Sequence, residues 1–264
     1  MLNWFFKILG LNIKHKSPPP NIHRERLKHI KLPSLIYAIG DVHGCLDLLQ
    51  NLEKQIEVDC KKEKQDALII MLGDYVDRGA QTAELIEHLI SPPAPSIKRL
   101  CLAGNHEEAM LAFLDNPKAN IKWLEFGGYE TLLSYGFSAS ELNLNSIKKR
   151  NFIHKINSFI PDEHINFLSK LPIIATFPKH IFVHAGIRPN ISIEKQTDRD
   201  LLWIRDSFLK HEGDYEFTII HGHTPVEKTY ISPSRINVDT GAYLSGHLSA
   251  IKIINGEISD ILTT

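Results

Sequence analysis

Three short apolar segments, each closed by a glycine, impose a regular alternation on the first half of the chain. They cover residues 35–39, 67–72 and 97–103 and have the length of buried strands. Apolar residues at helical spacing occupy the intervals at 48–56 and 83–90. Strand, helix, strand, helix, strand in this order predicts an α/β fold with a parallel sheet and right-handed crossovers.

The composition fits a globular protein with a real core. The chain has 264 residues, of which 43% are hydrophobic and 23% charged, which excludes a disordered or fibrous chain. Its three cysteines, Cys45, Cys60 and Cys101, have no CxxC spacing. This argues against a disulfide framework and a zinc cluster and favours a reducing compartment. We therefore expect a cytoplasmic location.

Residues 1–32 differ in character from the rest and are expected to form an appendage and linker. Residues 1–31 carry seven basic residues against the single acid Glu25, a net +6, so the remainder must carry −7 of the total −1. The apolar run over residues 1–13 is too short to span a bilayer, which needs about 20 residues. Beside a basic stretch it could contact an anionic membrane surface weakly, at the inner face of the membrane. The alternatives are a helix packed on the body and a frayed tail. The Pro-rich stretch at 17–20 predicts a stiff linker.

Polar side chains follow the three predicted strands directly. They are Asp41 and His43, then Asp74 and Asp77, then Asn105 and His106. In open α/β sheets ligands bind outside the carboxyl ends of the strands, so we expect these side chains to meet at one edge.

Later predicted strands end in the same way. The strand over residues 181–183 runs into His184, the strand over 217–220 into His221 and His223, and the strand over 235–238 into Asp239. Residues 248–254 are predicted to form the closing strand. Asp and Asn are common in turns, but the repeated occurrence of Asp, Asn or His close to a glycine at these strand ends indicates a single polar site.

The residue types at these strand ends suit divalent metals. Neutral imidazole and carboxylate together favour manganese, iron or zinc, and the absence of a well-placed cysteine argues against a structural zinc site. The chain offers enough ligands for two ions that share one carboxylate. Such a pair can activate water and stabilise the oxygens of an in-line displacement, so hydrolysis of a phosphate ester is the reaction that suits the site best.

Five sequence blocks resemble one enzyme family. GDVHG at 40–44, GDYVDRG at 73–79, GNHE at 104–107, HAG at 184–186 and GHTP at 222–225 are similar to the signature blocks of the metallophosphoesterase superfamily. More narrowly they resemble the phosphoprotein phosphatases, the PPP-type serine/threonine protein phosphatases, in their bacterial and phage branch. The resemblance spans about residues 35–254. It implies a calcineurin-like metallophosphoesterase fold, a central β-sandwich flanked by helices, over residues 33–264.

The resemblance also implies a dinuclear metal centre. Manganese is the first expectation for both ions, with iron or zinc as alternatives. The implied ligands are Asp41, His43, Asp74, Asn105, His184 and His223. Asp41 and His43 would hold the first ion, Asp74 would bridge the two, and the remaining three would hold the second.

Four further residues receive catalytic roles from the resemblance. His106, oriented by Asp77, would be the general acid that protonates the leaving alkoxide. Arg78 and Arg205 would grip the phosphoryl oxygens, which match the geometry of a guanidinium.

Other conspicuous residues are interpreted as structural. We expect His221, Cys45 and Trp203 to serve packing rather than chemistry. Amphipathic patterns over residues 111–172 predict a helical insertion that flanks the strand-end site and shapes the substrate groove.

These observations predict a metal-dependent phosphomonoester hydrolase that acts on phosphoserine or phosphothreonine in protein, with a small phosphoester as another substrate class. The first alternative is a bis(5′-nucleosyl)-tetraphosphatase, symmetrical or asymmetrical, which resembles the chain in its first block and metal set. Such enzymes typically carry GNHD where this chain has GNHE, and they lack the Asp77–Arg78 pairing. The second alternative is a non-catalytic scaffold recruited to a membrane. No nucleic-acid partner is expected, because residues 32–264 are net negative.

Overall fold

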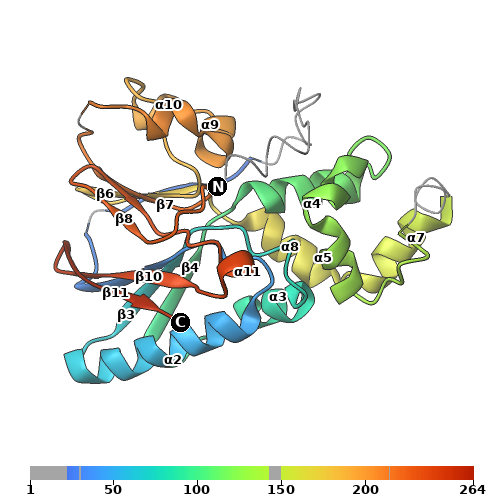
Figure 1. The fold of residues 1–264 in the computed structure, drawn as a ribbon, viewed down its shortest axis with the longest axis horizontal. Helices are drawn as coiled ribbons and strands as arrows, with labels where there is room; N and C mark the ends of the chain where they lie inside the picture. The colour runs from blue at the N-terminus through green and yellow to red at the C-terminus, as the bar shows by residue number, and fades with distance from the viewer. Residues whose placement is uncertain (1–22, 30, 143–149, 214) are drawn as a thin grey trace.

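Two β-sheets pack face to face, with helices on their outer sides (Figure 1). The computed structural model describes residues 23–29, 31–142, 150–213 and 215–264. The six-stranded sheet has the order β1 (Arg26–Lys28), β5 (Ile174–Thr176), β6 (His180–Val183), β7 (Thr218–His221), β9 (Arg235–Asn237), β8 (Tyr230–Ile231). The five-stranded sheet has the order β11 (Glu257–Thr263), β10 (Ser249–Ile254), β2 (Leu35–Ile39), β3 (Ala67–Met71), β4 (Ile97–Cys101). The predicted β-sandwich is confirmed.

The strands β2, β3 and β4 run parallel, as the alternation in the sequence predicts. They are linked by α2 (Leu46–Glu63) and α3 (Thr82–Ile90). Alternate residues of β2 point to opposite faces: Ile36 and Ala38 enter the core between the sheets, whereas Tyr37 and Ile39 pack on the helical side. Both faces are therefore buried, which explains why the strand is apolar without interruption.

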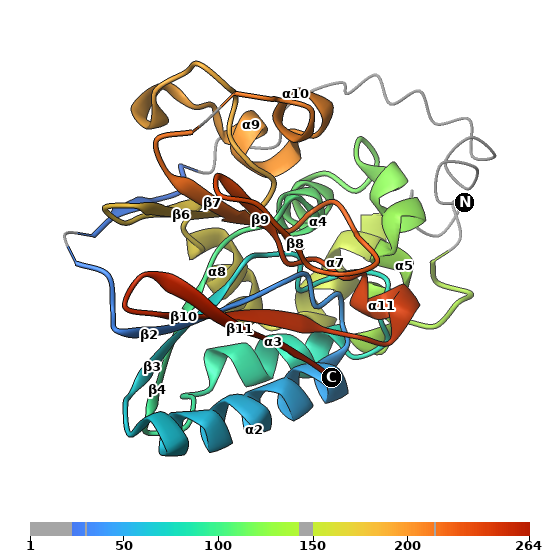
Figure 2. The same ribbon diagram turned by 60° about the vertical axis from the view of Figure 1, so that its left-hand side comes forward.

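The core between the sheets draws on both of them. Its buried members are Ile36, Ala38, Ile70, Leu72, Leu102, Ala175, Phe177, Phe182, Ile220, Ile236, Val238, Ile251 and Ile253. Helices α2 and α3 lie outside the five-stranded sheet, whereas α9 (Asp198–Trp203) and α10 (Asp206–Leu209) lie beyond the six-stranded sheet (Figure 2).

Most of the remaining helices come from the predicted insertion at 111–172. Helix α4 (Asn105–Asp115) leads into η1 (Ile121–Phe126), α5 (Gly128–Ser134), α7 (Arg150–Phe159) and α8 (Asp162–Lys170). They lie to one side of the strands (Figure 1). The short elements η2 (Ile193–Lys195) and α11 (Ala242–Ser245) complete the helices of the described part. None of its helices has both the length and the apolar character needed to cross a membrane.

The sheets extend further than the sequence indicates. Residues 26–28, which we assign to the appendage, form β1 and pair in parallel with β5. The preceding Arg24 is 3% exposed and donates to the carbonyl oxygens of Leu168 and Leu171 at 3.0 Å each. A three-residue strand with two basic residues carries no apolar pattern, so the sequence does not reveal it. The apolar run over residues 1–13 and the Pro-rich linker lie outside the described residues.

The strand over residues 249–254 is not the last one, which corrects our prediction. Asn255 and Gly256 both have positive φ and turn the chain into β11, which pairs antiparallel with β10. Asn-Gly is a strong hairpin signal, so this strand was detectable. Its residues are mostly exposed, because β11 is the edge of the sheet, and they lack an apolar run.

Candidate metal centre and active site

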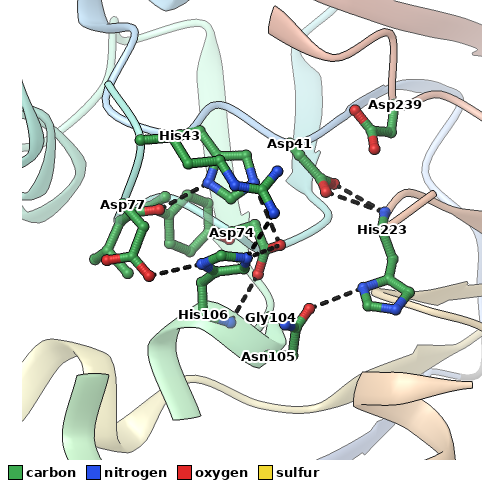
Figure 3. A network of polar contacts seen from close by, with 12 residues as sticks. Asp41, His43, Asp74, Asp77, Gly104, Asn105, His106, His223 and Asp239 are labelled. Atoms are coloured by element: carbon green, nitrogen blue, oxygen red, sulfur yellow. Dashed lines mark hydrogen bonds and ion pairs between the residues drawn. The ribbon is translucent and has the colours of Figure 1, made fainter. Parts of the chain in front are cut away.

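The predicted site residues meet where the strands of both sheets end. Asp41 follows β2 and Asp74 follows β3, whereas Asn105 opens α4 after β4. From the other sheet, His184 follows β6 and His223 follows β7. All five are at most 6% exposed. Figure 3 shows the side chains of Asp41, Asp74, Asn105, His106 and His223 gathered in one small region, with Asp77 in contact with His106.

The backbone at this site is held in an uncommon conformation. Eight non-glycine residues of the described chain have positive φ, and five of them are predicted site residues. These five are His43, Asp74, Asp77, Arg78 and His223. Positive φ costs free energy in residues other than glycine, so its concentration here indicates a functional constraint on side-chain direction.

Two histidines present lone pairs to the same carboxylate. His43 Nδ1 lies 2.8 Å from the carbonyl oxygen of Val76, and His184 Nδ1 lies 2.9 Å from that of Leu72. A carbonyl only accepts, so both Nδ1 atoms carry the proton. The Nε2 atoms of both rings then face Asp74. His43 Nε2 lies 3.5 Å from Asp74 Oδ2, and His184 Nε2 lies 3.4 Å from Asp74 Oδ1. Burial lowers the pKa of both imidazoles, which keeps them neutral.

The amide of Asn105 and the ring of His223 join the same cluster. Asn105 Oδ1 lies 2.8 Å from His184 Nε2 and 2.8 Å from His223 Nδ1. The other ring nitrogen of His223 has no hydrogen-bond partner among the described residues. Burial also lowers the pKa of His223. Lone pairs thus converge here from neutral ring nitrogens, an amide oxygen and a carboxylate. This set of ligand atoms fits a divalent cation.

Asp74 lies between two groups of candidate ligands. One group contains His43, Asp74 and His106, and the other contains Asp74, His184 and His223, with the ligand atoms of each group within 4.8 Å of one another. Burial raises the pKa of the Asp74 carboxyl, but the surrounding histidines, His184 first, lower it by more. An ionised carboxylate shared by two groups suits the predicted bridging role.

Asp41 lies at the edge of this arrangement. Its oxygens accept from the backbone N–H of His223 at 3.0 and 3.2 Å, and Oδ1 is 4.0 Å from His184 Nδ1. It belongs to neither of the two compact groups. Burial, followed by the nearby carboxylates of Asp239 and Asp74, raises the pKa of Asp41.

His106 is held by a second, separate network. Its Nδ1 lies 2.6 Å from Asp77 Oδ2, which also accepts from the indole N–H of Trp123 at 2.8 Å. Asp77 Oδ1 accepts from the Thr131 hydroxyl at 2.9 Å. Burial lowers the pKa of His106, but Asp74 and Asp77 outweigh it and the net shift is upward. His106 Nε2 lies 3.9 Å from Asp74 Oδ2, so it faces the same space as the candidate ligands.

The two predicted phosphate-binding arginines occupy different surroundings. Arg78 Nη2 lies 3.1 Å from His106 Nε2, and its guanidinium stacks over the ring of Tyr243 at 4.5 Å. Arg205 is exposed, with Nη1 3.5 Å from the Thr224 hydroxyl in the loop that carries His223. Both guanidinium groups are therefore near the candidate ligands, Arg78 firmly held and Arg205 freer.

Several residues around the site were not assigned from the sequence. Trp123 and Thr131 come from the helical insertion, and no local signal reveals that they reach Asp77. Glu107, the last residue of the GNHE block, is fully buried and accepts from the backbone N–H groups of Gly104, Asp74, Tyr75 and Val76. The four-residue block itself was the signal for Glu107, which ties the second block to the third.

His221 remains apart from these groups, as expected. It is buried, with Nδ1 3.0 Å from the carbonyl oxygen of Gly222 and Nε2 3.3 Å from Arg235 Nη1. Its ring also meets Phe208 edge to face. Burial lowers its pKa to about 3, so it is a neutral packing residue.

A family model described as calcineurin-like phosphoesterase matches residues 34–248. The chain belongs to this family. The match covers the strands and loops that carry the candidate metal ligands. The chain is therefore a metallophosphoesterase, a phosphoester hydrolase of a family that uses divalent metal ions.

Two differently named curated proteins illustrate what this metallophosphoesterase is similar to. The asymmetrical bis(5′-nucleosyl)-tetraphosphatase PrpE of Halalkalibacterium halodurans is 27% identical over 236 residues, which cover 81% of this chain and 88% of the relative. Serine/threonine-protein phosphatase 2 of Salmonella typhimurium is 29% identical over 227 residues, which cover 83% of this chain and 92% of the relative. These similarities are consistent with the bacterial PPP-type branch expected from the sequence.

Solved structures confirm the fold of this metallophosphoesterase. The crystal structure of a putative diadenosine tetraphosphatase superimposes with a TM-score of 0.63 at 16% identity, covering 92% of this chain and 98% of that one. At this identity the similarity shows the calcineurin-like fold alone.

Proposed function

We propose that the chain removes phosphate from phosphoserine or phosphothreonine in proteins, with two divalent metal ions, manganese first. The observation that carries this proposal is the hydrogen bond of 2.6 Å between His106 Nδ1 and Asp77 Oδ2. The carboxylate is fixed by Trp123 and Thr131, so the imidazole is held with its Nε2 toward the candidate metal ligands. This is the arrangement of a positioned general acid.

The rate gain from a general acid depends on how basic the leaving group is. A serine or threonine alkoxide is strongly basic and must be protonated as the P–O bond breaks. A nucleoside phosphate that leaves from a dinucleotide polyphosphate is a far weaker base and needs little protonation. A buried, oriented acid is therefore more valuable to a phosphomonoesterase that releases an alcohol than to a tetraphosphatase.

Asp41, His43 and Asp74 would hold the first ion, and Asp74, Asn105, His184 and His223 the second. When bound, the ions supply Lewis-acid polarisation of the phosphoryl group and activation of water. The chain supplies the rest. Asp74 keeps the two ligand groups together.

Arg78 and Arg205 would grip the phosphoryl oxygens. Arg78 donates to His106 Nε2 at 3.1 Å only while that nitrogen is unprotonated. Once His106 carries the proton that it will give to the leaving alkoxide, Arg78 has lost this acceptor and can turn to the phosphate. Stacking on Tyr243 keeps its guanidinium at the site during this change.

Hydrolysis of dinucleotide tetraphosphates is the second candidate. It is supported by the relatives named PrpE, which match most of the chain. The same metal ligands and the same arginines would serve a polyphosphate, and only the demand for His106 would differ.

Turnover of two substrates distinguishes the candidates. The protein is stripped with a chelator, reloaded with Mn²⁺ and assayed with a phosphothreonine peptide and with diadenosine tetraphosphate. We expect faster turnover of the peptide, dependent on Mn²⁺ and lost in Asp74→Asn. Preference for the dinucleotide would assign the chain to the tetraphosphatases. No turnover of either would contradict both candidates and favour a scaffold.

We also propose a cytoplasmic protein that touches an anionic membrane surface weakly through residues 1–31, chiefly through the part before Arg24, because Arg24 and β1 belong to the folded body. The proposal rests on the charge and apolar residues of this segment and on the free cysteines. Flotation with anionic vesicles tests it, comparing the full chain with one that starts at His23. The shorter chain keeps Arg24 and β1, which belong to the folded body. Equal flotation of both chains would contradict the membrane contact.

A further inference from the structure

A buried carboxylate beside the metal ligands has no assigned role. Asp239 follows β9 and is 1% exposed. Its Oδ1 accepts from the backbone N–H of Gly241 at 2.8 Å, but its Oδ2 has no hydrogen-bond partner among the described residues. Figure 3 shows Asp239 next to Asp41, at the side of the site where His223 enters.

The backbone holds Asp239 firmly in this place. Its N–H donates to Asn237 Oδ1 at 3.1 Å, and its carbonyl oxygen accepts from Val226 N at 2.9 Å. Asn237 also donates to the carbonyl oxygen of Thr224, one residue after His223. The turn after β9 and the loop that carries His223 are thus joined, and Asp239 cannot easily turn toward solvent.

A glycine fits between the two carboxylates. A Cβ atom on Gly222 would lie 2.1 Å from Asp41 Oδ1 and 3.7 Å from Asp239 Cβ. Only a residue without a side chain allows the carboxylates to sit on either side of this backbone. The buried carboxylates of Asp41 and Asp239 therefore flank the same backbone segment.

A cation would stabilise the buried carboxylates of Asp41 and Asp239. The carboxylates of Asp41 and Asp239 are both buried, and Asp239 Oδ2 has no hydrogen-bond partner among the described residues. An unpaired buried carboxylate is strongly unfavourable unless it is neutralised or paired with a cation. A metal ion beside Asp41 would provide the missing positive charge.

We propose that Asp239 is a positioning residue of the first metal position, the one formed by Asp41, His43 and Asp74. Its free Oδ2 accepts a hydrogen bond from water in the hydration shell of the ion, and its charge raises the affinity for the ion without direct ligation. Carboxylates in this outer position typically change metal affinity 10- to 100-fold when they are removed. The inference rests on the proposed dinuclear site, not on the identity of the substrate.

Titration calorimetry with Mn²⁺ alone tests the proposal on the chelator-stripped full chain. We expect two ions to bind to the original protein. Asp239→Asn should bind one of them about 10- to 100-fold more weakly and the other unchanged. Asp260→Asn, which neutralises an exposed carboxylate on β11, is the matched control and should bind both ions normally.

Stability of the metal-free chains separates this role from a structural one. Asp239→Asn removes a repulsive buried charge, so its metal-free form should be at least as stable to urea as the original protein. A large loss of metal-free stability, or unchanged affinity for both ions, would overturn the proposal. Absence of Mn²⁺ binding to the original protein would overturn both the proposal and the dinuclear site.

A crystal structure of the Mn²⁺-loaded original protein tests the geometry without any variant. We expect Asp239 Oδ2 within hydrogen-bond distance of a water in the hydration shell of the first ion. Direct contact with the ion, or no water at Oδ2, would contradict the outer position. Because neither measurement uses a substrate, failure of the phosphatase proposal leaves this result interpretable.

Discussion

Asp77 binds His106 and Trp123 through the same oxygen, with His106 Nδ1 at 2.6 Å and Trp123 Nε1 at 2.8 Å from Oδ2. The indole is part of the helical insertion, whereas Asp77 and His106 follow strands of the sheet. The insertion thus fixes the carboxylate that orients the proposed acid.

Replacement of His106 by asparagine should lower kcat on a phosphothreonine peptide by about 10²- to 10⁴-fold, the usual value of a positioned acid. Metal content should stay near that of the original protein, because the proposed role of His106 Nε2 is to protonate the leaving oxygen, and this nitrogen lies 3.1 Å from Arg78 Nη2. The decrease in kcat should be much smaller for p-nitrophenyl phosphate, because this substrate releases a weakly basic phenolate. Metal analysis and both assays check this, with the exposed His154→Asn as control. Loss of metal in His106→Asn would instead make His106 a ligand.

Trp123→Phe should weaken catalysis without removing the acid. It deletes one donor to Asp77 Oδ2 and keeps the aromatic packing against Phe113. We expect a decrease in kcat of about two- to tenfold, in line with a net loss of about 0.5–1.5 kcal/mol for one hydrogen bond. KM for the peptide should stay unchanged, because Trp123 contacts Asp77 and not the phosphate. A change in KM alone would contradict this role.

Metal removal should destabilise the folded chain measurably. Ligands that bind only the native state add about 4 kcal/mol at a thousandfold excess over Kd, which corresponds to a Tm shift of about 10 °C at this size. Differential scanning calorimetry before and after chelation measures the shift, and added Mn²⁺ should restore it. In Asp74→Asn the chelator should have almost no effect. If the Tm of the original protein did not change on addition of the chelator, the folded state would bind no ion.

Gly222→Ala should damage the metal centre more than the fold. The new Cβ would lie 2.1 Å from Asp41 Oδ1 and force that carboxylate away from the backbone N–H of His223. We expect at least a tenfold loss of Mn²⁺ affinity with a stability loss of about 1–3 kcal/mol. Gly213→Ala is the matched control, since its Cβ meets only the movable ring of His211. Equal Mn²⁺ affinity in the two variants would show that Asp41 is not needed for binding.

Stability should depend on pH through a group far from the metal centre. Glu53 accepts from Arg99 at 2.7 Å and lies 2.6 Å from His88 Nε2. Burial raises the pKa of Glu53, but His88 and Arg99 outweigh it, and the net shift is below the ordinary value of 4.5. A lowered folded-state pKa stabilises the protein above the unfolded pKa, and this contribution is lost as pH falls through the folded value.

Glu53→Gln should therefore reduce the free energy of unfolding near neutral pH by about 1–3 kcal/mol, the range for hydrogen bonds to charged groups. The difference from the original protein should shrink below pH 4.5. Urea unfolding across this pH range measures it, with Glu57→Gln in the same helix as control. A difference that grows toward acid pH would reverse the assigned direction of the shift.

The sequence reveals those parts of the fold and site that depend on local pattern. The strands that end before Asp41 and Asp74 are buried on both faces, so they stand out as apolar runs, and the polar residue after each run marks the site. The neighbours of Asp77 could not be predicted, because Trp123 reaches it through tertiary packing across 46 residues. Asp239 could be predicted from the sequence only in part. Its strand-end pattern is visible in the sequence, but its unpaired oxygen appears only in the structure.

Neither sheet carries a complete set of the proposed ligands. Asp41, Asp74 and Asn105 follow strands of one sheet, whereas His184 and His223 follow strands of the other. During synthesis, the amino-terminal half leaves the ribosome with its carboxylates in place but without the two later imidazoles. The second ion can therefore be captured in full only when residue 223 has emerged and the sandwich has closed. Binding of the second ion would therefore occur only after the two sheets have packed together, at the end of folding.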